Sequence, residues 1–147
     1  MQKRKKQRKM IVINKNATTN IITTLWELTT LEVPYYLFEF ESDQTKKKYY
    51  TVMTDLSTNK TRYNEFNFIE GSFDSDQFDP PPGTLTLGSA GFYKYKVYEQ
   101  SSSSNLDPTG LNEVEQGKMK LIDSTYQPSF NQHTVSPTTN VVYNPAQ

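Results

Sequence analysis

The sequence predicts an all-β fold in which two sheets pack face to face as a β-sandwich. Aromatic residues make up 13% of the 147 residues, with ten tyrosines and eight phenylalanines, and such residues favour pleated, half-buried surfaces. Alanine, the best helix former, occurs only at Ala17, Ala90 and Ala146. Short runs alternate apolar and polar residues between turn signals, and almost no helical period is present. These three observations together predict about seven or eight strands.

A basic N-terminal arm, residues 1–16, precedes the predicted sandwich domain at residues 17–125. The first ten residues carry six positive charges, whereas the rest of the chain carries ten basic and sixteen acidic side chains, a net charge of −6. Dense like charges repel one another and bury nothing, so we expect the arm to stay disordered until it meets a partner. The residues expected to bind that partner electrostatically are Lys3, Arg4, Lys5, Lys6, Arg8 and Lys9.

The first half of the domain contains four predicted strand regions. Residues 20–30 are rich in β-branched residues and predict one strand, or two short ones around Trp26. In "PYYLFEFES" strict alternation predicts a half-buried strand, with Tyr36, Phe38 and Phe40 on one face and Leu37, Glu39 and Glu41 on the other. After a turn at "DQTK", residues 47–57 alternate again. A turn at residues 57–60 then leads to a strand with Tyr63, Phe66, Phe68 and Ile69.

The second half begins with three prolines, Pro80 to Pro82, which predict a stiff extended connection that ends at Gly83. "TLTLGSAG" predicts a short strand. The next strand, "FYKYKVYE", and the last one, "EVEQGKMKLID", are expected to form a hairpin around a loop at residues 100–112 with a type I turn at residues 107–110. Lysines lie on the outward face of both strands. The predicted inward residues, which form the structural core, are Tyr93, Tyr95, Val97, Met119 and Leu121.

The number of strands and one local motif predict a sandwich of the immunoglobulin type, with extended N- and C-terminal arms. "GFYKY" has the Gly-x-Tyr-x-hydrophobe order of a tyrosine corner, in which Tyr93 is the corner residue and Tyr95 stands where antibody domains have cysteine. From residue 126 to 147 prolines alternate with isolated apolar residues. We expect this extended C-terminal tail to dock on a neighbour, with "VVY" as an added strand.

The residues give little reason to expect catalysis, a metal or a cofactor. Cysteine is absent, which excludes disulfides, thiolate metal sites and cysteine nucleophiles. The one histidine, His133, lies in the proline-broken tail, and the acidic run with Asp74, Asp76 and Asp79 lacks the glycine and the final glutamate of a calcium loop. Glu39 and Glu41 are expected to face water. No apolar run approaches a membrane span, so we expect a soluble protein made in the cytoplasm.

Two segments resemble a known group of proteins. They are "YYLFEFESDQTKKKYYTVMTDLSTNKTRYNEFNFIEG" and "LTLGSAGFYKYKVYEQSSSSNLDPTGLNEVEQGKMKLID". They resemble a small virion structural protein of tailed phages that infect Bacteroidota, the crAss-like phages included. The resemblance covers about residues 20–125 and leaves out the basic arm. It implies a capsid or neck component located in the virion, without catalytic residues or cofactors.

The favoured interpretation is therefore an auxiliary capsid protein that binds the shell of the major capsid protein in many copies. A neck or tail component is an alternative within the virion. A nucleic-acid-binding protein, whose arm reaches packaged DNA, is an alternative from another class, because clustered lysines and arginines neutralise phosphates. A carbohydrate-binding module would use the many tyrosines and Trp26, although interleaved tyrosines more often form cross-strand pairs. The arm itself either binds nucleic acid, binds an acidic protein surface, or only keeps the protein soluble.

Overall fold

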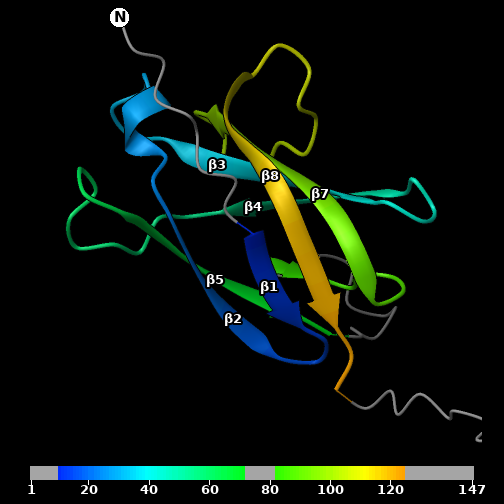
Figure 1. Cartoon of the computed structure of the whole chain (residues 1–147). Helices are drawn as coiled ribbons and strands as arrows, with labels where there is room; N and C mark the ends of the chain where they lie inside the picture. The colour runs from blue at the N-terminus through cyan, green and yellow to red at the C-terminus, as the bar shows by residue number, and fades with distance from the viewer. Residues whose placement is uncertain (1–9, 72–81, 125–147) are drawn as a thin grey trace, which may run out of the picture.

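The computed structural model describes residues 10–71 and 82–124, and it contains a β-sandwich of two sheets (Figure 1). A single turn of 3₁₀ helix, η1 (Trp26–Leu28), is the one helical element in these residues. The strands are β1 (Met10–Asn14), β2 (Thr18–Thr23), β3 (Tyr35–Ser42), β4 (Lys48–Met53), β5 (Asn64–Glu70), β6 (Thr84–Leu85), β7 (Gly91–Gln100) and β8 (Asn112–Ile122). The predicted all-β sandwich is confirmed.

The larger sheet has the strand order β1-β8-β7-β3-β4, and the smaller one has the order β2-β5-β6. In the larger sheet β1 runs parallel to β8, and the other neighbours are antiparallel. The positions of β8, β7, β3 and β4 correspond to strands G, F, C and C′ of an immunoglobulin variable-type sandwich. The smaller sheet differs from that pattern, because β6 pairs parallel with β5.

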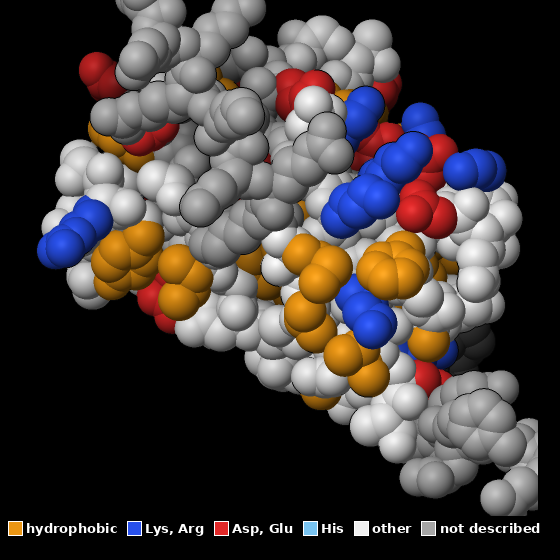
Figure 2. Space-filling model, viewed as in Figure 1, with side chains coloured by type: hydrophobic (Ala, Val, Ile, Leu, Met, Phe, Trp, Pro, Cys, Tyr) orange, Lys and Arg blue, Asp and Glu red, His pale blue; other side chains and the backbone are white. Residues whose placement is uncertain are grey.

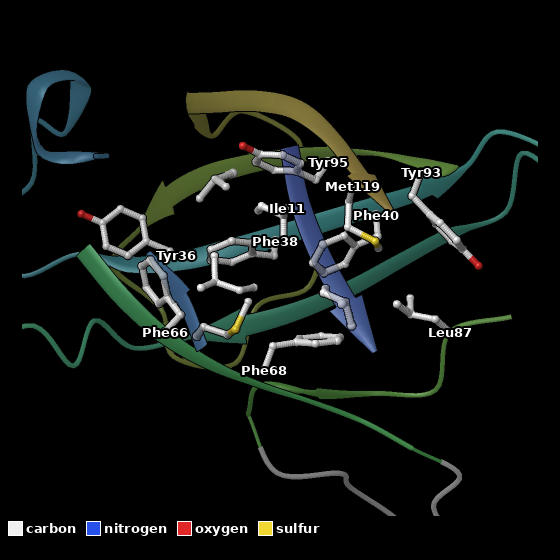
Figure 3. Packing of buried hydrophobic residues seen from close by; sticks show 14 of the residues in the cluster. Ile11, Tyr36, Phe38, Phe40, Phe66, Phe68, Leu87, Tyr93, Tyr95 and Met119 are labelled. Carbon is white, nitrogen blue, oxygen red and sulfur yellow. The ribbon is translucent and has the colours of Figure 1, made fainter. Parts of the chain in front are cut away.

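Aromatic side chains from both sheets form the core between them (Figure 3). Phe38 on β3 meets Phe66 on β5 edge to face, with ring centroids 5.0 Å apart. Two residues further along each strand, Phe40 meets Phe68 with the rings tilted at 56° and their centroids 5.4 Å apart. Offset contacts of this kind add to the free energy gained by burying the rings. The alternation of "YYLFEFES" therefore provides the contact between the two sheets.

The residues predicted to form the core lie in it, on the neighbouring strands β7 and β8. All five are at most 1% exposed: Tyr93, Tyr95, Val97, Met119 and Leu121. Tyr93 and Met119 are direct partners in the ladder. The Tyr93 hydroxyl donates a hydrogen bond to the backbone carbonyl of Ser89 at 2.8 Å, which is the arrangement of a tyrosine corner. Burial raises the pKa of Tyr93 to about 12.

The boundary predicted between arm and body, after residue 16, is wrong. Residues 10–14 form β1, where Ile11 and Ile13 are buried in the core cluster. The reason is that the six charges all lie before Met10, while "MIVIN" alternates like any half-buried strand. The sandwich therefore begins at Met10, and the charged residues 1–9 lie outside the described residues.

Four local expectations also need correction. β2 ends at Thr23, and Trp26 lies in η1, so residues 20–30 are one strand followed by a helical turn. The turn after β4 is centred later than expected, because the Asn59 carbonyl accepts hydrogen bonds from the N–H groups of Arg62 and Tyr63. The turn in the β7–β8 loop is shifted by one residue, to residues 108–111, where the N–H of Leu111 donates to the Pro108 carbonyl.

The fourth correction concerns the outward face of β3. Leu37 and Glu39 are buried there, whereas the alternation predicted a solvent-facing side. Their flanking strands β4 and β7 shield them, because β3 is an inner strand of the sheet. The expectations for His133, for the acidic run at residues 74–79 and for the tail at residues 126–147 fall outside the described residues.

Candidate interaction face

The outer surface of β1, β8 and β7 forms a face that we call the lysine face. It is defined by the outward side chains of these three neighbouring strands: Met10, Val12, Phe92, Lys94, Lys96, Lys118, Lys120 and Ile122. The inward neighbours of the same residues fill the core, so strand alternation fixes the direction of each side chain. Figure 2 shows lysines and apolar side chains interleaved on this side of the molecule.

Two lysines lie directly opposite each other at the centre of this face. Lys94 on β7 and Lys118 on β8 are register partners, and Lys96 and Lys120 flank them. Like charges directly opposite on neighbouring strands destabilise a sheet. Among the described residues the one ion pair is formed by Lys48 and Glu39. None of these four ammonium groups therefore lies within 4.0 Å of a carboxylate of the described residues. On its other side Lys94 is the register partner of Glu41 on β3, and Lys96 is the partner of Glu39, so β3 supplies opposite charge along that edge of the face. The opposed pair Lys94 and Lys118 is the part of the arrangement that folding does not favour, and it suits a negatively charged partner.

Apolar side chains share the face with the lysines. Met10 is 50% exposed, Phe92 49% and Val12 41%. The Lys120 ammonium lies 5.6 Å from the centre of the Phe92 ring, a cation–π contact that holds both side chains over the sheet. A cluster of exposed apolar side chains with charged neighbours is typical of a protein or nucleic-acid contact surface.

The lysine face is also where the charged N-terminal residues join the body. Met10, the first residue of β1, is the register partner of Lys118. The six predicted partner-binding residues, Lys3, Arg4, Lys5, Lys6, Arg8 and Lys9, all lie within the seven positions before Met10. Their own positions are outside the described residues, but their point of attachment is the edge of the lysine face. Ten positive side chains therefore belong to, or lead directly into, one side of the molecule.

No family model, curated protein or solved structure matches this chain.

Part of the acidic charge of the body is used inside the fold. Glu39, Glu70 and Glu99 are each at most 5% exposed. Glu70 accepts hydrogen bonds from the backbone N–H groups of Asn16 and Leu87, at 2.7 and 3.1 Å, and so links β5 to the segments around it. Carboxylates held in this way contribute less to the outer surface than the sequence count implies. One side of the body can therefore be locally basic although the net charge of the body is negative.

The expectation that Glu39 faces water is wrong, because its side chain is buried. It does not face water but accepts hydrogen bonds from the hydroxyls of Tyr50 and Tyr98, at 3.4 and 3.0 Å, and pairs with Lys48 at 3.4 Å. Burial first, and then the Glu39 carboxylate, raise the pKa of Tyr98 above its ordinary value. These partners come from neighbouring strands, so the position of Glu39 within its own strand could not reveal them.

The described residues offer little that resembles a reaction centre. They contain no group of three histidine, cysteine, aspartate or glutamate side chains placed to hold a metal ion. In the same part of the chain no helix is long and apolar enough to cross a membrane. The lysine face, with its opposed lysines and exposed apolar side chains, is the best candidate for a functional surface. The alternation within each strand predicted that its lysines point outward. That these lysines form one site could not be predicted, because it depends on the register of β7 against β8.

Proposed function

We propose that the protein is a non-enzymatic virion structural protein, an auxiliary capsid protein bound to the shell of the major capsid protein in many copies. The observation that carries the proposal is the opposed pair Lys94 and Lys118 at the centre of a partly apolar face. The resemblance of residues 20–125 to virion proteins of tailed phages supports it. In this proposal the lysine face and the charged residues 1–9 attach the sandwich to an acidic, partly apolar surface of a shell subunit.

An acidic protein surface accounts for both components of the lysine face. Complementary charge speeds association and fixes orientation, while burial of apolar side chains at the centre adds affinity. Met10, Val12 and Ile122 are aliphatic side chains that a phosphate backbone cannot use. A neck or tail subunit could present the same chemistry, and the copy number per particle distinguishes these locations from the shell.

Nucleic acid is the second candidate partner, because of Phe92. An exposed aromatic ring beside a row of lysines is the combination on which single-stranded nucleic acid stacks its bases and neutralises its phosphates. Packaged DNA would then lie against the face, with residues 1–9 extending the contact. Binding of this kind falls steeply with salt because counterions are released.

Charge reversal at the centre of the face tests the proposal. We expect Lys94→Glu/Lys118→Glu to weaken binding to purified particles of the phage that encodes the protein by at least about tenfold at low salt, since each reversal replaces an attraction by a repulsion. The matched control is Lys60→Glu/Arg62→Glu, which makes the same change in net charge in the exposed loop between β4 and β5. Equal loss of binding in both double variants would contradict a specific role for the lysine face.

Deletion of residues 2–9 provides the complementary variant. It should leave the melting temperature nearly unchanged and reduce incorporation into particles, and this reduction should fade at higher salt as counterions screen the charges. Incorporation equal to that of the full-length chain would favour a solubilising role for these residues. Nuclease treatment separates the two partners: binding that survives it identifies protein, and binding that disappears identifies nucleic acid.

A further inference from the structure

The segment between β2 and β3, residues 24–34, crosses from the smaller sheet to the larger one, and we call it the strap (Figure 1). It contains η1. Leu25, directly before η1, is buried in the core cluster, and its backbone N–H donates a hydrogen bond to Asn64 Oδ1 on β5 at 2.7 Å. The Thr29 hydroxyl lies 3.0 Å from the Tyr36 hydroxyl on β3. The strap is therefore fixed to both sheets.

Further hydrogen bonds join the strap to β7 and β8. The Glu99 carboxylate on β7 accepts hydrogen bonds from the backbone N–H groups of Thr30 and Leu31, at 2.8 and 3.3 Å. The side-chain amide of Asn112 on β8 donates to the Leu28 carbonyl at 3.5 Å. These contacts hold the strap in one conformation, so the surface that it presents is formed before a partner binds, which lowers the cost of binding.

The outward side chains of the strap form an apolar surface. Val33 is 74% exposed, Leu28 49%, and Trp26 and Leu31 are 36% exposed each. Single exposed apolar side chains are common on proteins, but a group of four within residues 26–33 is typical of a contact surface. Tryptophan in particular contributes strongly to the affinity of protein interfaces. The strap is therefore suited to bind another protein.

The charge of the strap is negative, which is opposite to that of the lysine face. Glu27 and Glu32 are its two charged residues and both are exposed, while residues 16–45 contain no lysine or arginine. Since Lys48 and Glu39 form the one ion pair among the described residues, neither strap carboxylate lies within 4.0 Å of a lysine or arginine in that part of the chain. The strap thus presents carboxylates without partners among exposed apolar side chains.

We infer that the strap of one copy of this chain binds the lysine face of another copy when no other partner occupies that face. Glu27 and Glu32 are opposite in charge to the opposed pair Lys94 and Lys118, and both surfaces carry exposed apolar side chains whose burial favours association. Like charges disfavour contacts between two straps or between two lysine faces. The inference goes beyond the proposed function, because the strap then competes with the shell subunit for the same face.

Sedimentation equilibrium of the purified full chain, without particles, tests the inference. We expect the average mass to rise with concentration between about 10 µM and 1 mM. Glu27→Lys/Glu32→Lys and Lys94→Glu/Lys118→Glu should each raise the dissociation constant about tenfold or more, because each gives the two surfaces the same sign. The variant with all four substitutions reverses both surfaces, which makes them complementary again, so it should associate like the wild type.

A matched control separates this contact from an effect of net charge. It combines Glu27→Lys/Glu32→Lys with Lys46→Glu/Lys47→Glu in the exposed loop between β3 and β4. Its net charge equals that of the wild type and of the fourfold reversal, but its strap and its lysine face are both basic. We therefore expect it to associate as weakly as Glu27→Lys/Glu32→Lys alone.

Trp26, the only tryptophan of the chain, reports whether the strap is the surface that becomes covered. Its emission should shift to shorter wavelength as the concentration rises, and Lys94→Glu/Lys118→Glu should lack this shift. Three results would overturn the inference: a mass of one chain up to about 1 mM, equal association of the fourfold reversal and the control, or association without a shift at Trp26. None of them bears on the proposed function, which is tested by binding to particles.

Discussion

Replacing Tyr95 by alanine is expected to lower the free energy of unfolding by about 3–5 kcal/mol. The side chain is 1% exposed and lies between the two sheets (Figure 3). Its hydroxyl donates a hydrogen bond to the Glu115 Oε1 atom at 2.7 Å. Alanine would leave a cavity of aromatic size and would also remove a partner from a partly buried carboxylate. Because native domains are stable by only about 5–15 kcal/mol, this one change could unfold much of the protein.

Chemical denaturation at neutral pH measures this effect, and Tyr95→Phe is its control. Phenylalanine keeps the ring and loses only the hydrogen bond, so it should lower the free energy of unfolding by about 1 kcal/mol. A Tyr95→Ala variant that melts within about a degree or two of the parent would contradict the inward position of this side chain.

Replacing Glu99 by alanine is the second large expected effect, with a loss of about 3 kcal/mol. The carboxylate is 3% exposed and lies at the end of β7. It accepts hydrogen bonds from the Thr30 hydroxyl, from the backbone N–H groups of Thr30 and Leu31, and from the Asn112 side-chain amide at 2.9 Å. Without it, the segment between η1 and β3 would lose its attachment to β7, and backbone donors would remain unpaired.

The same carboxylate predicts a dependence on pH. Burial alone would raise the pKa of Glu99, but hydrogen bonds from Thr30, Asn112 and the two backbone N–H groups outweigh it and hold the pKa below the ordinary value. A depressed pKa stabilises the fold above the unfolded pKa, about 4.3, and this contribution is lost as the pH falls through the folded pKa. The stability difference between the wild type and Glu99→Gln should therefore shrink from pH 7 to pH 3. Urea denaturation at both pH values measures it, and a difference that grows in acid would contradict the assigned hydrogen bonds.

Most of the fold follows from the sequence, because alternation is a local property. Tyr36, Phe38 and Phe40 share a face for the same reason that Tyr93, Tyr95 and Val97 do, since successive side chains of a strand point to opposite sides. The β7–β8 hairpin was predictable from its turn residues and from the alternation on both sides of the loop. Once an immunoglobulin-like sandwich is assumed, its known topology allows few orders for the strands of the larger sheet.

The misplaced features depend on partners that are distant in sequence. β1 has only two buried side chains, Ile11 and Ile13, and its place beside β8 depends on a parallel pairing across more than a hundred residues. The dense positive charge before Met10 led to the prediction of a disordered arm, and the short alternation of "MIVIN" was not recognised as a strand. Glu39 and Glu99 are buried because tyrosine hydroxyls, backbone N–H groups and an amide reach them from other strands or loops. A carboxylate in an alternating strand gives no sign of this on its own.

The lysine face was predictable only in part from the sequence. That Lys94, Lys96, Lys118 and Lys120 point outward could be predicted strand by strand. That Lys94 faces Lys118, and that Met10 brings the charged N-terminal residues to the same place, depends on register and on the parallel β1 strand. This candidate surface therefore could not be predicted from any one strand, because it depends on the alignment of three strands.

The most direct test of the proposed function is quantitative mass spectrometry of purified particles of the tailed phage to which the proposal assigns this chain. We expect the protein to be present in many copies, at a ratio to the major capsid protein that stays constant through further purification. A few copies per particle would instead assign the protein to the neck or tail. Its absence from particles that contain the major capsid protein would contradict the proposal that it is a virion component.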